Sequence, residues 1–243
     1  MARVGELHVG TAGWQLPKGF EQHPTECTHL QRYARHFNAA EINTTFYRPH
    51  RIETFQRWAD SVPEEFRFAV KLHKDITHGK RLMEVAPVQP FLAMVEALGQ
   101  KLGPVLVQLP PSLPYSMDAA DFLSALREVY NGPVVLEARH PSWAEREAKE
   151  TLIEHAVSGV AAGPPLIIDA VEPWGHPDLA YFRLHGSPQV YWSSYTDEFL
   201  QRLARQVSEL LRAGKEVWVI FDNTGAGAGA PDAMRLKAYL QQL

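Results

Sequence analysis

The sequence of 243 residues contains a single cysteine, Cys27, so no disulfide can form within the chain. A lone cysteine fits a reducing compartment. There is also no apolar run of about 18 residues, which a membrane-spanning helix would need, and no apolar signal core follows Met1. We therefore expect a soluble, cytoplasmic protein without a membrane partner.

Basic residues are not in excess. Lys and Arg number 24 against 28 Asp and Glu, which gives a formal net charge of -4. Proteins that hold nucleic acid by bulk electrostatics usually carry a basic surplus. Nucleic acid is therefore not the favoured partner, although a local basic rim at Lys74, Lys80 and Arg81 keeps a nucleic-acid enzyme open as an alternative.

Linkers and low-complexity tracts are missing too, apart from the short Gly225–Ala230 stretch. Hydrophobic residues make up 45% of the chain, enough for a sizeable core. Eight short apolar runs alternate with helical patterns, which favours a closed parallel barrel. We predict one (β/α) TIM-type barrel domain over residues 1–243. Its expected strands are Leu7–Gly10, Ala39–Asn43, Phe66–His73, Val105–Leu109, Val134–Arg139, Leu166–Asp169, Tyr181–His185 and Val217–Asp222.

The intervening helices are indicated by apolar residues at helical spacing in Thr28–Phe37, Asp118–Tyr130 and Thr196–Ala213. Asp118 is the expected N-cap of the second, and Gly214 ends the third. Only Ala170–Ala180 separates the sixth and seventh strands, and its prolines and glycine forbid a proper helix. This connection must be abbreviated, or one strand is misplaced.

Polar residues gather where the expected strands finish. On four strands they occur at positions i and i+2, which point to the same face because strand side chains alternate. The outer face of a barrel strand lies under helices, so these pairs should point inward at the carboxyl end, where barrel enzymes keep their chemistry. The pairs are Glu41 and Asn43, Lys71 and His73, Glu137 and Arg139, and Arg183 and His185; Gln108, Asp169 and Asp222 end three further strands.

The same residues carry a resemblance. Together with several loop motifs, they make the chain similar to domain-of-unknown-function family 72, the YecE-like proteins. The resemblance implies a barrel similar to the xylose isomerase and endonuclease IV type, and it implies no activity. The chain departs from the family pattern in a short segment after Trp14 and in Asp222, where the family tends to have asparagine. The matching segments are Gly10–Trp14, Glu41–Tyr47, Phe68–Lys71, Ile76–His78, Gln108–Pro111, Glu137–Trp143, Arg183–Gly186, Tyr195 and Phe221–Asn223.

The near balance of acids and bases at the strand ends favours an acid/base enzyme acting on a small anionic or phosphorylated ligand. A hydrolase, a lyase and an isomerase all fit this pattern. The expected catalytic residues are Glu41, Lys71, Glu137 and His185. The expected ligand-binding residues are Thr11, Trp14, Asn43, His73, Gln108, Arg139, Asp169, Arg183, Asp222 and Asn223.

Three alternatives stay open. No cofactor is expected, but a divalent metal on Glu41, Glu137, Asp169, His185 and Asp222 would make the protein a phosphoesterase, nuclease or isomerase. A non-catalytic protein that binds a phosphorylated metabolite would need the same pocket. The charged residues could also form a buried network that only stabilises the barrel.

The Gly225–Ala230 stretch follows the last expected strand and precedes a helix. A glycine-rich turn at a helix N-terminus can expose backbone amides to a phosphate. A plain flexible loop explains it equally well.

Overall fold

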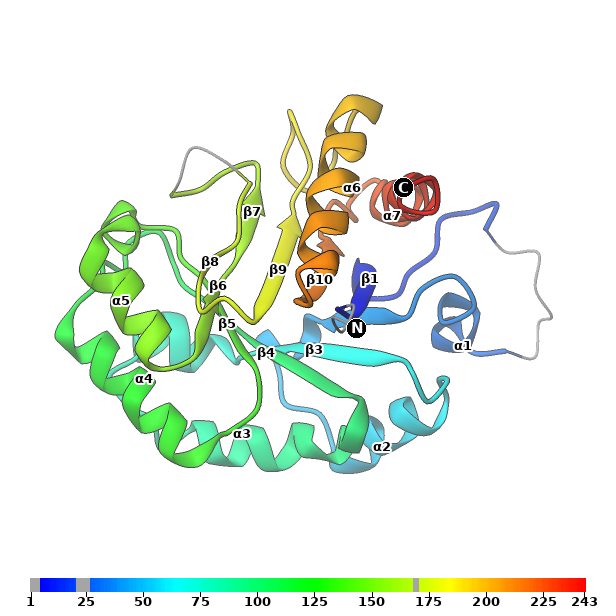
Figure 1. Ribbon diagram of the computed structural model, residues 1–243. Helices are drawn as coiled ribbons and strands as arrows, with labels where there is room; N and C mark the ends of the chain where they lie inside the picture. The colour runs from blue at the N-terminus through cyan, green and yellow to red at the C-terminus, as the bar shows by residue number, and fades with distance from the viewer. Residues whose placement is uncertain (1–4, 21–26, 168–170) are drawn as a thin grey trace.

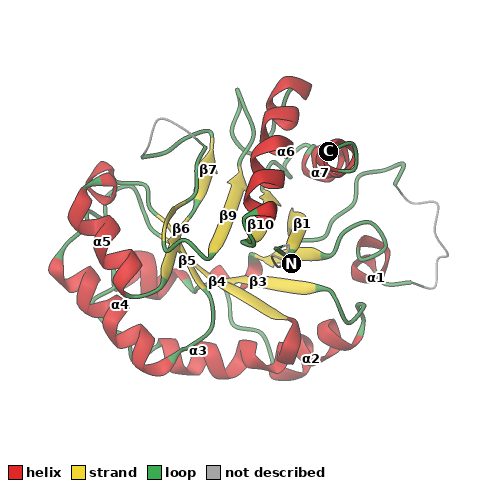
Figure 2. Ribbon diagram, viewed as in Figure 1, coloured by secondary structure: helices red, strands yellow, loops and turns green. Residues whose placement is uncertain are grey.

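The computed structural model describes residues 5–20, 27–167 and 171–243. Their strands form one sheet in the order β7-β9-β10-β1-β2-β3-β4-β5-β6-β8, with helices around the outside (Figures 1 and 2). The strands are β1 (Leu7–Ala12), β2 (Ala39–Ile42), β3 (Arg67–Lys71), β4 (Leu102–Gln108), β5 (Val134–Glu137), β6 (Val157–Gly159), β7 (Ala161–Gly163), β8 (Trp174–Gly175), β9 (Leu179–Leu184) and β10 (Glu216–Phe221).

The sheet curls into a nearly closed barrel because β6 and β7 are two halves of one extended segment. They are separated only by Val160. The first half pairs with β5 and the second half with β9, both in parallel. The short β8 is antiparallel to β6, and the other pairings are parallel. This confirms the predicted barrel.

The sixth strand was predicted in the wrong place. Leu166 and Ile167 lie in bends, the rest of Leu166–Asp169 lies outside the described residues, and the strand pairing belongs to residues 157–163 instead. This strand is rich in small residues with low strand propensity, so propensity does not predict it. Gly159 is required because the Trp174 ring packs so closely on it that a Cβ there would lie 2.1 Å from the ring. The connection to β9 contains no helix among its described residues, so it is abbreviated as predicted.

The helices are α1 (His29–Tyr33), α2 (Ile52–Asp60), α3 (Val88–Val95), α4 (Met117–Val129), α5 (Arg146–Glu154), α6 (Asp197–Arg212) and α7 (Gly229–Leu240). Short turns add η1 (Thr44–Phe46), the π-helical η2 (Asp75–Gly79), η3 (Glu96–Lys101) and η4 (Pro141–Ala144). None of the helices in the described part is long and apolar enough to cross a membrane.

The predicted helices occur with altered ends. The first is shorter than expected, and Thr28 caps it through a reciprocal capping box with Gln31. Ser116, not Asp118, is the N-cap of α4, since its hydroxyl accepts the Ala119 amide. Gly214 follows α6 at a φ of 80°, a backbone conformation that glycine adopts without strain.

The barrel interior explains the position of the polar strand ends. It is filled by a separate apolar cluster that includes Ala39, Ala69, Leu106, Val135, Tyr181 and Ile220. Two residues further along the same strands, on the same face, come Glu41, Lys71, Gln108, Glu137, Arg183 and Asp222. The alternation of the strands thus places one polar layer directly above the apolar plug, at the carboxyl end of the barrel.

Candidate functional site

The centre of the polar layer is the guanidinium of Arg183, which is 1% exposed. Its Nε and Nη2 donate to both carboxylate oxygens of Glu41, at 2.8 to 3.2 Å. Its Nη1 donates to Glu137 Oε2 at 3.1 Å, and Nη2 lies 3.0 Å from Asp222 Oδ2. Arg183, on β9, therefore connects to the carboxyl ends of three other strands, β2, β5 and β10. Nearly all its donors are used within this network, so it organises the floor of the site.

Glu41 is completely buried, and a second group holds it in place. The Tyr181 hydroxyl donates to Glu41 Oε2 at 2.9 Å. Tyr181 lies two residues before Arg183 on β9, so it points to the same interior face. The alternation rule that selected Arg183 would have found Tyr181 as well, had it been extended by one step.

Glu137 is the second hub. Its Oε1 accepts from Gln108 Nε2 at 2.8 Å and from Arg139 Nε and Nη2 at 3.0 and 2.8 Å. Burial alone would raise the pKa of the Glu137 carboxyl, but Arg183, His185 and Arg139 outweigh burial and hold that pKa well below its usual value. Glu137 is a fixed anion surrounded by more positive than negative groups.

His185 lies between two carboxylates. Its Nδ1 is 3.1 Å from Asp222 Oδ2, and its Nε2 is 3.5 Å from Glu137 Oε2. Burial lowers the pKa of the imidazole, but Glu137 and the hydrogen bond with Asp222 outweigh that effect and raise it above its ordinary value. Burial would raise the pKa of Asp222, yet Arg183 and His185 bring it below normal.

Lys71 differs from the other cations of the layer. It is 6% exposed, and its ammonium lies 3.9 Å above the centre of the Phe46 ring. Among the described residues it has no ion pair with a carboxylate. Burial and Arg183 lower the pKa of Lys71 to about 8, against the weaker attraction of Glu41, Glu137 and Asp222.

The rim above Lys71 contains residues that the strand-end pattern missed. His78, in the π-helical turn η2, packs edge-on against Phe46 with ring centres 5.0 Å apart. Burial, then Lys71 and Arg139, lower the pKa of His78, so its imidazole is neutral. Tyr191 packs edge-on against His185 and lies 3.5 Å from Arg139 through its hydroxyl. These groups lie in loops, where strand alternation gives no signal.

Three expected ligand residues lie away from this layer, around the first loop. The Thr11 hydroxyl donates to the Gly13 carbonyl and contacts Tyr33. Trp14 packs edge-on against Trp58, with ring centres 5.0 Å apart. Trp14 and Asn43 line a separate cavity of about 500 Å³ beside the strand ends of β1 and β2.

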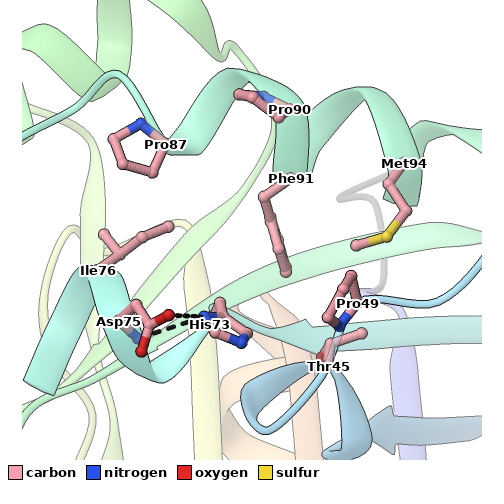
Figure 3. A pocket seen from close by; sticks show the side chains of 9 residues that line it. All are labelled: Thr45, Pro49, His73, Asp75, Ile76, Pro87, Pro90, Phe91 and Met94. Carbon is pink, nitrogen blue, oxygen red and sulfur yellow. Dashed lines mark hydrogen bonds and ion pairs between the residues drawn. The ribbon is translucent and has the colours of Figure 1, made fainter. Parts of the chain in front are cut away.

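Two further expected ligand-binding residues, His73 and Asn223, make their contacts outside the polar layer. His73 faces a cavity between η2 and α3, on the outer side of the barrel (Figure 3). Asn223 donates through Nδ2 to Ser193 O and Asp232 Oδ2, at 2.9 and 2.8 Å. Asp169 lies outside the described residues.

The loop after β10 offers no evident place for a phosphate. The carboxylate of Asp232 is completely buried in the first turn of α7, where it accepts hydrogen bonds from Ser194 and the Tyr195 amide. A negative charge therefore already occupies this helix N-terminus. As for metals, the described ranges contain no group of three or more His, Cys, Asp or Glu side chains that could hold an ion.

Residues 8–243 match the model of a family described as "Protein of unknown function DUF72". The chain belongs to the DUF72 family. This confirms the resemblance seen in the strand-end motifs.

Two named relatives of this DUF72 chain come from bacteria. UPF0759 protein YecE of Escherichia coli K12 is 33% identical over 150 residues, which are 60% of this chain and 53% of YecE. The chain thus spans about half the length of that relative in the match. UPF0759 protein YunF of Bacillus subtilis is 23% identical, over 96% of this chain and 94% of YunF.

Solved DUF72 structures share the fold. A crystal structure from Thermotoga maritima is similar with a TM-score of 0.79 and 28% identity, covering 97% of this chain and 99% of that one. One from Enterococcus faecalis gives a TM-score of 0.81 at 22% identity, covering 97% and 95%. The names of these relatives state no activity, so a proposal about function rests on the side chains at the mouth.

Proposed function

We propose that this DUF72 protein is an acid/base enzyme that acts on a small anionic ligand at the mouth of the barrel, with Lys71 as the proton acceptor. One observation carries the proposal: Lys71 is a buried amine without a carboxylate partner among the described residues, and its pKa is about 8. A general base works best when its pKa lies near the operating pH. An ordinary lysine, with a pKa of about 10.4, would be almost fully protonated there.

The fixed ion pairs below Lys71 have a different role in this proposal. Glu41 and Glu137 hold Arg183 rigidly, so the floor of the site does not reorganise when a ligand arrives. We assign the two glutamates as positioning residues. His185, whose pKa is raised by Glu137 and Asp222, is the proton donor of the site in this proposal.

Arg139 is the best-placed group to hold an anion. Its Nε and Nη2 contact Glu137, while its Nη1 has no hydrogen-bond partner in the described ranges, and its side chain is 22% exposed. Glu137 is shared with Arg183 and His185, so it does not cancel the charge of Arg139 alone. A phosphate or carboxylate next to Nη1 would gain a charge-assisted hydrogen bond.

Thermal-shift measurements with matched ligand pairs test the proposal. Each pair consists of a phosphorylated or carboxylated metabolite and its neutral parent, such as glucose 6-phosphate and glucose. A ligand that binds only the folded state raises its stability by about 2.7 kcal/mol at a hundredfold excess over its dissociation constant. We expect shifts only from the anionic members. Arg139→Ala should abolish most of the shift, and Arg146→Ala, which alters an arginine with a 90% exposed side chain, should keep it.

A hit is then tested for turnover. Lys71→Met should bind the anion within a few-fold of the native affinity yet lose turnover, and the native rate should rise with pH through the pKa of Lys71 near 8. Shifts from neutral ligands alone, indifferent to Arg139→Ala, would overturn anion recognition. An anion that binds and is not converted would favour a sensor, and hits confined to oligonucleotides would favour a nucleic-acid protein. Either result would reject an acid/base enzyme acting on a small anionic ligand.

A further inference from the structure

A cavity of about 240 Å³ lies outside the barrel, between α3 and the turns η1 and η2 (Figure 3). We call it the side pocket. Its walls are mainly apolar and come from Pro49, Ile76, Pro87, Pro90, Phe91 and Met94, while His73 projects into it from the end of β3. The polar layer of the mouth does not include these wall residues, so the side pocket is a distinct feature of the molecule.

The His73 imidazole gives the side pocket one polar contact of defined chemistry. Its Nδ1 accepts the Asp75 backbone amide at 3.3 Å, which leaves Nε2 as the nitrogen that carries an N–H. That Nε2 has no hydrogen-bond partner within the described part of the chain. The Asp75 carboxylate lies 3.5 Å from the same ring and makes the neighbourhood unfavourable for an anion. The pocket thus offers the His73 N–H as a donor, beside Asp75 and Thr45, among otherwise apolar walls.

We infer that the side pocket binds a neutral, ring-sized apolar group that carries one hydrogen-bond acceptor. The volume fits this class, because a cavity of about 150 Å³ already holds benzene, and the extra space accommodates one or two substituents. Three of the wall residues are prolines, whose fixed backbone lowers the ordering cost of binding. Met94 supplies a flexible side chain that can adapt to the ring. This inference stands independently of the proposed function.

The side pocket is also joined to the mouth through the chain. Thr45, which lines the pocket, donates its hydroxyl to the Lys71 carbonyl at 2.7 Å, and the next residue, Phe46, supports the Lys71 ammonium. Ile76 lines the pocket on the same turn η2 that carries His78 to the mouth. A group in the side pocket therefore contacts the two turns that surround Lys71.

Calorimetry with three probes, 4-methylphenol, toluene and 4-methylbenzoate, tests this site. We expect 4-methylphenol to bind best, toluene to bind more weakly by about three- to tenfold because it lacks the acceptor, and 4-methylbenzoate to bind weakest because of Asp75. His73→Phe should reduce the affinity for 4-methylphenol to that for toluene. Equal binding of 4-methylbenzoate and 4-methylphenol would contradict the inference.

Met94→Trp fills the pocket and should lower the affinity for 4-methylphenol by about tenfold or more. Met117→Trp, at a methionine that is 63% exposed at the start of α4, is the matched control and should bind normally. A second measurement needs no substitution at all: with methyl-labelled methionine, 4-methylphenol should shift the Met94 resonance and leave Met117 unchanged. An unmoved Met94 signal, or undiminished binding by folded Met94→Trp, would overturn the site.

Discussion

The Lys71 ammonium lies 3.9 Å from the centre of the Phe46 ring, and a ring face takes the place that a carboxylate would normally have. The anions of the site are instead held by Arg183, which contacts Glu41, Glu137 and Asp222. Burial consequently lowers the pKa of Lys71 to about 8. A charged group in that position costs stability, which is the pattern expected of a residue kept for function.

Lys71→Met should therefore stabilise the protein at pH 7, by up to roughly 3 kcal/mol for a shift of this size. Between pH 8 and about 10.4 the unfolded chain binds more protons at Lys71 than the folded one, so native stability rises with pH across that window. The advantage of the variant should shrink accordingly. Urea denaturation at pH 7 and pH 10 measures both effects.

The matched control for Lys71 is Lys80→Met, which removes an exposed lysine that pairs with Glu84 just after η2. It should change stability by less than about 0.5 kcal/mol at either pH. A Lys71→Met variant less stable than the native protein at pH 7 would mean that Lys71 is a structural cation.

Arg183→Met should cost about 3–5 kcal/mol, because it leaves buried carboxylates without their counter-charge. Glu41, Glu137 and Asp222 all lose a contact at once. The double variant Arg183→Met/Glu41→Gln removes one of the stranded charges and should recover part of that loss. Chemical denaturation gives the free energy of unfolding of the two variants. If the double variant is no more stable than Arg183→Met, the cost comes from packing alone.

Strand alternation made the polar layer of the mouth predictable from the sequence. Glu41, Gln108, Glu137 and Arg183 each end an apolar run, and a side chain two residues after an interior apolar one must point the same way. The rule fails one step later. His73 follows Lys71 by two residues, but β3 has ended at Lys71, so the alternation no longer applies to it.

The strand-end pattern did not predict several other features. The segment from Val157 to Gly163 is rich in small residues, and Gly159 is required by its close contact with Trp174, a tertiary effect that strand propensity cannot show. His78 comes to the mouth through packing against Phe46. The absence of a carboxylate beside Lys71 likewise depends on which cation captures the acids, and only the folded geometry determines that.

Tyr195 fixes the loop that follows β9. Its hydroxyl accepts the Gly186 amide at 2.9 Å and donates to the Gly163 carbonyl at the end of β7. Tyr195→Phe should leave the Gly186 N–H without a partner and cost about 1–3 kcal/mol. Hydrogen exchange at the Gly186 amide should be faster in Tyr195→Phe than in the native protein. Tyr47→Phe, at a 65% exposed tyrosine, is the control and should change neither quantity; an unchanged Gly186 exchange rate in Tyr195→Phe would refute the role.

Asp222→Asn should lower the pKa of His185, since the hydrogen bond that His185 donates to Asp222 is one of the interactions that raise it against burial. We expect a decrease of about one unit or more, the size of effect that a neighbouring charge exerts. In the native protein, the raised pKa of His185 contributes stability below its unfolded pKa of about 6.5, and this contribution is lost as pH rises through the folded value. In the variant that loss should begin at lower pH.

The titration of the His185 ring followed by NMR gives the pKa directly, and denaturation curves between pH 5.5 and 9 give the matching stability change. Glu84→Gln, which alters an exposed carboxylate that pairs with Lys80, should leave the His185 titration where it was. If the His185 pKa does not move in Asp222→Asn, then Glu137 alone keeps the imidazole charged. The proton donor of the proposed reaction would then depend on β5 rather than on β10.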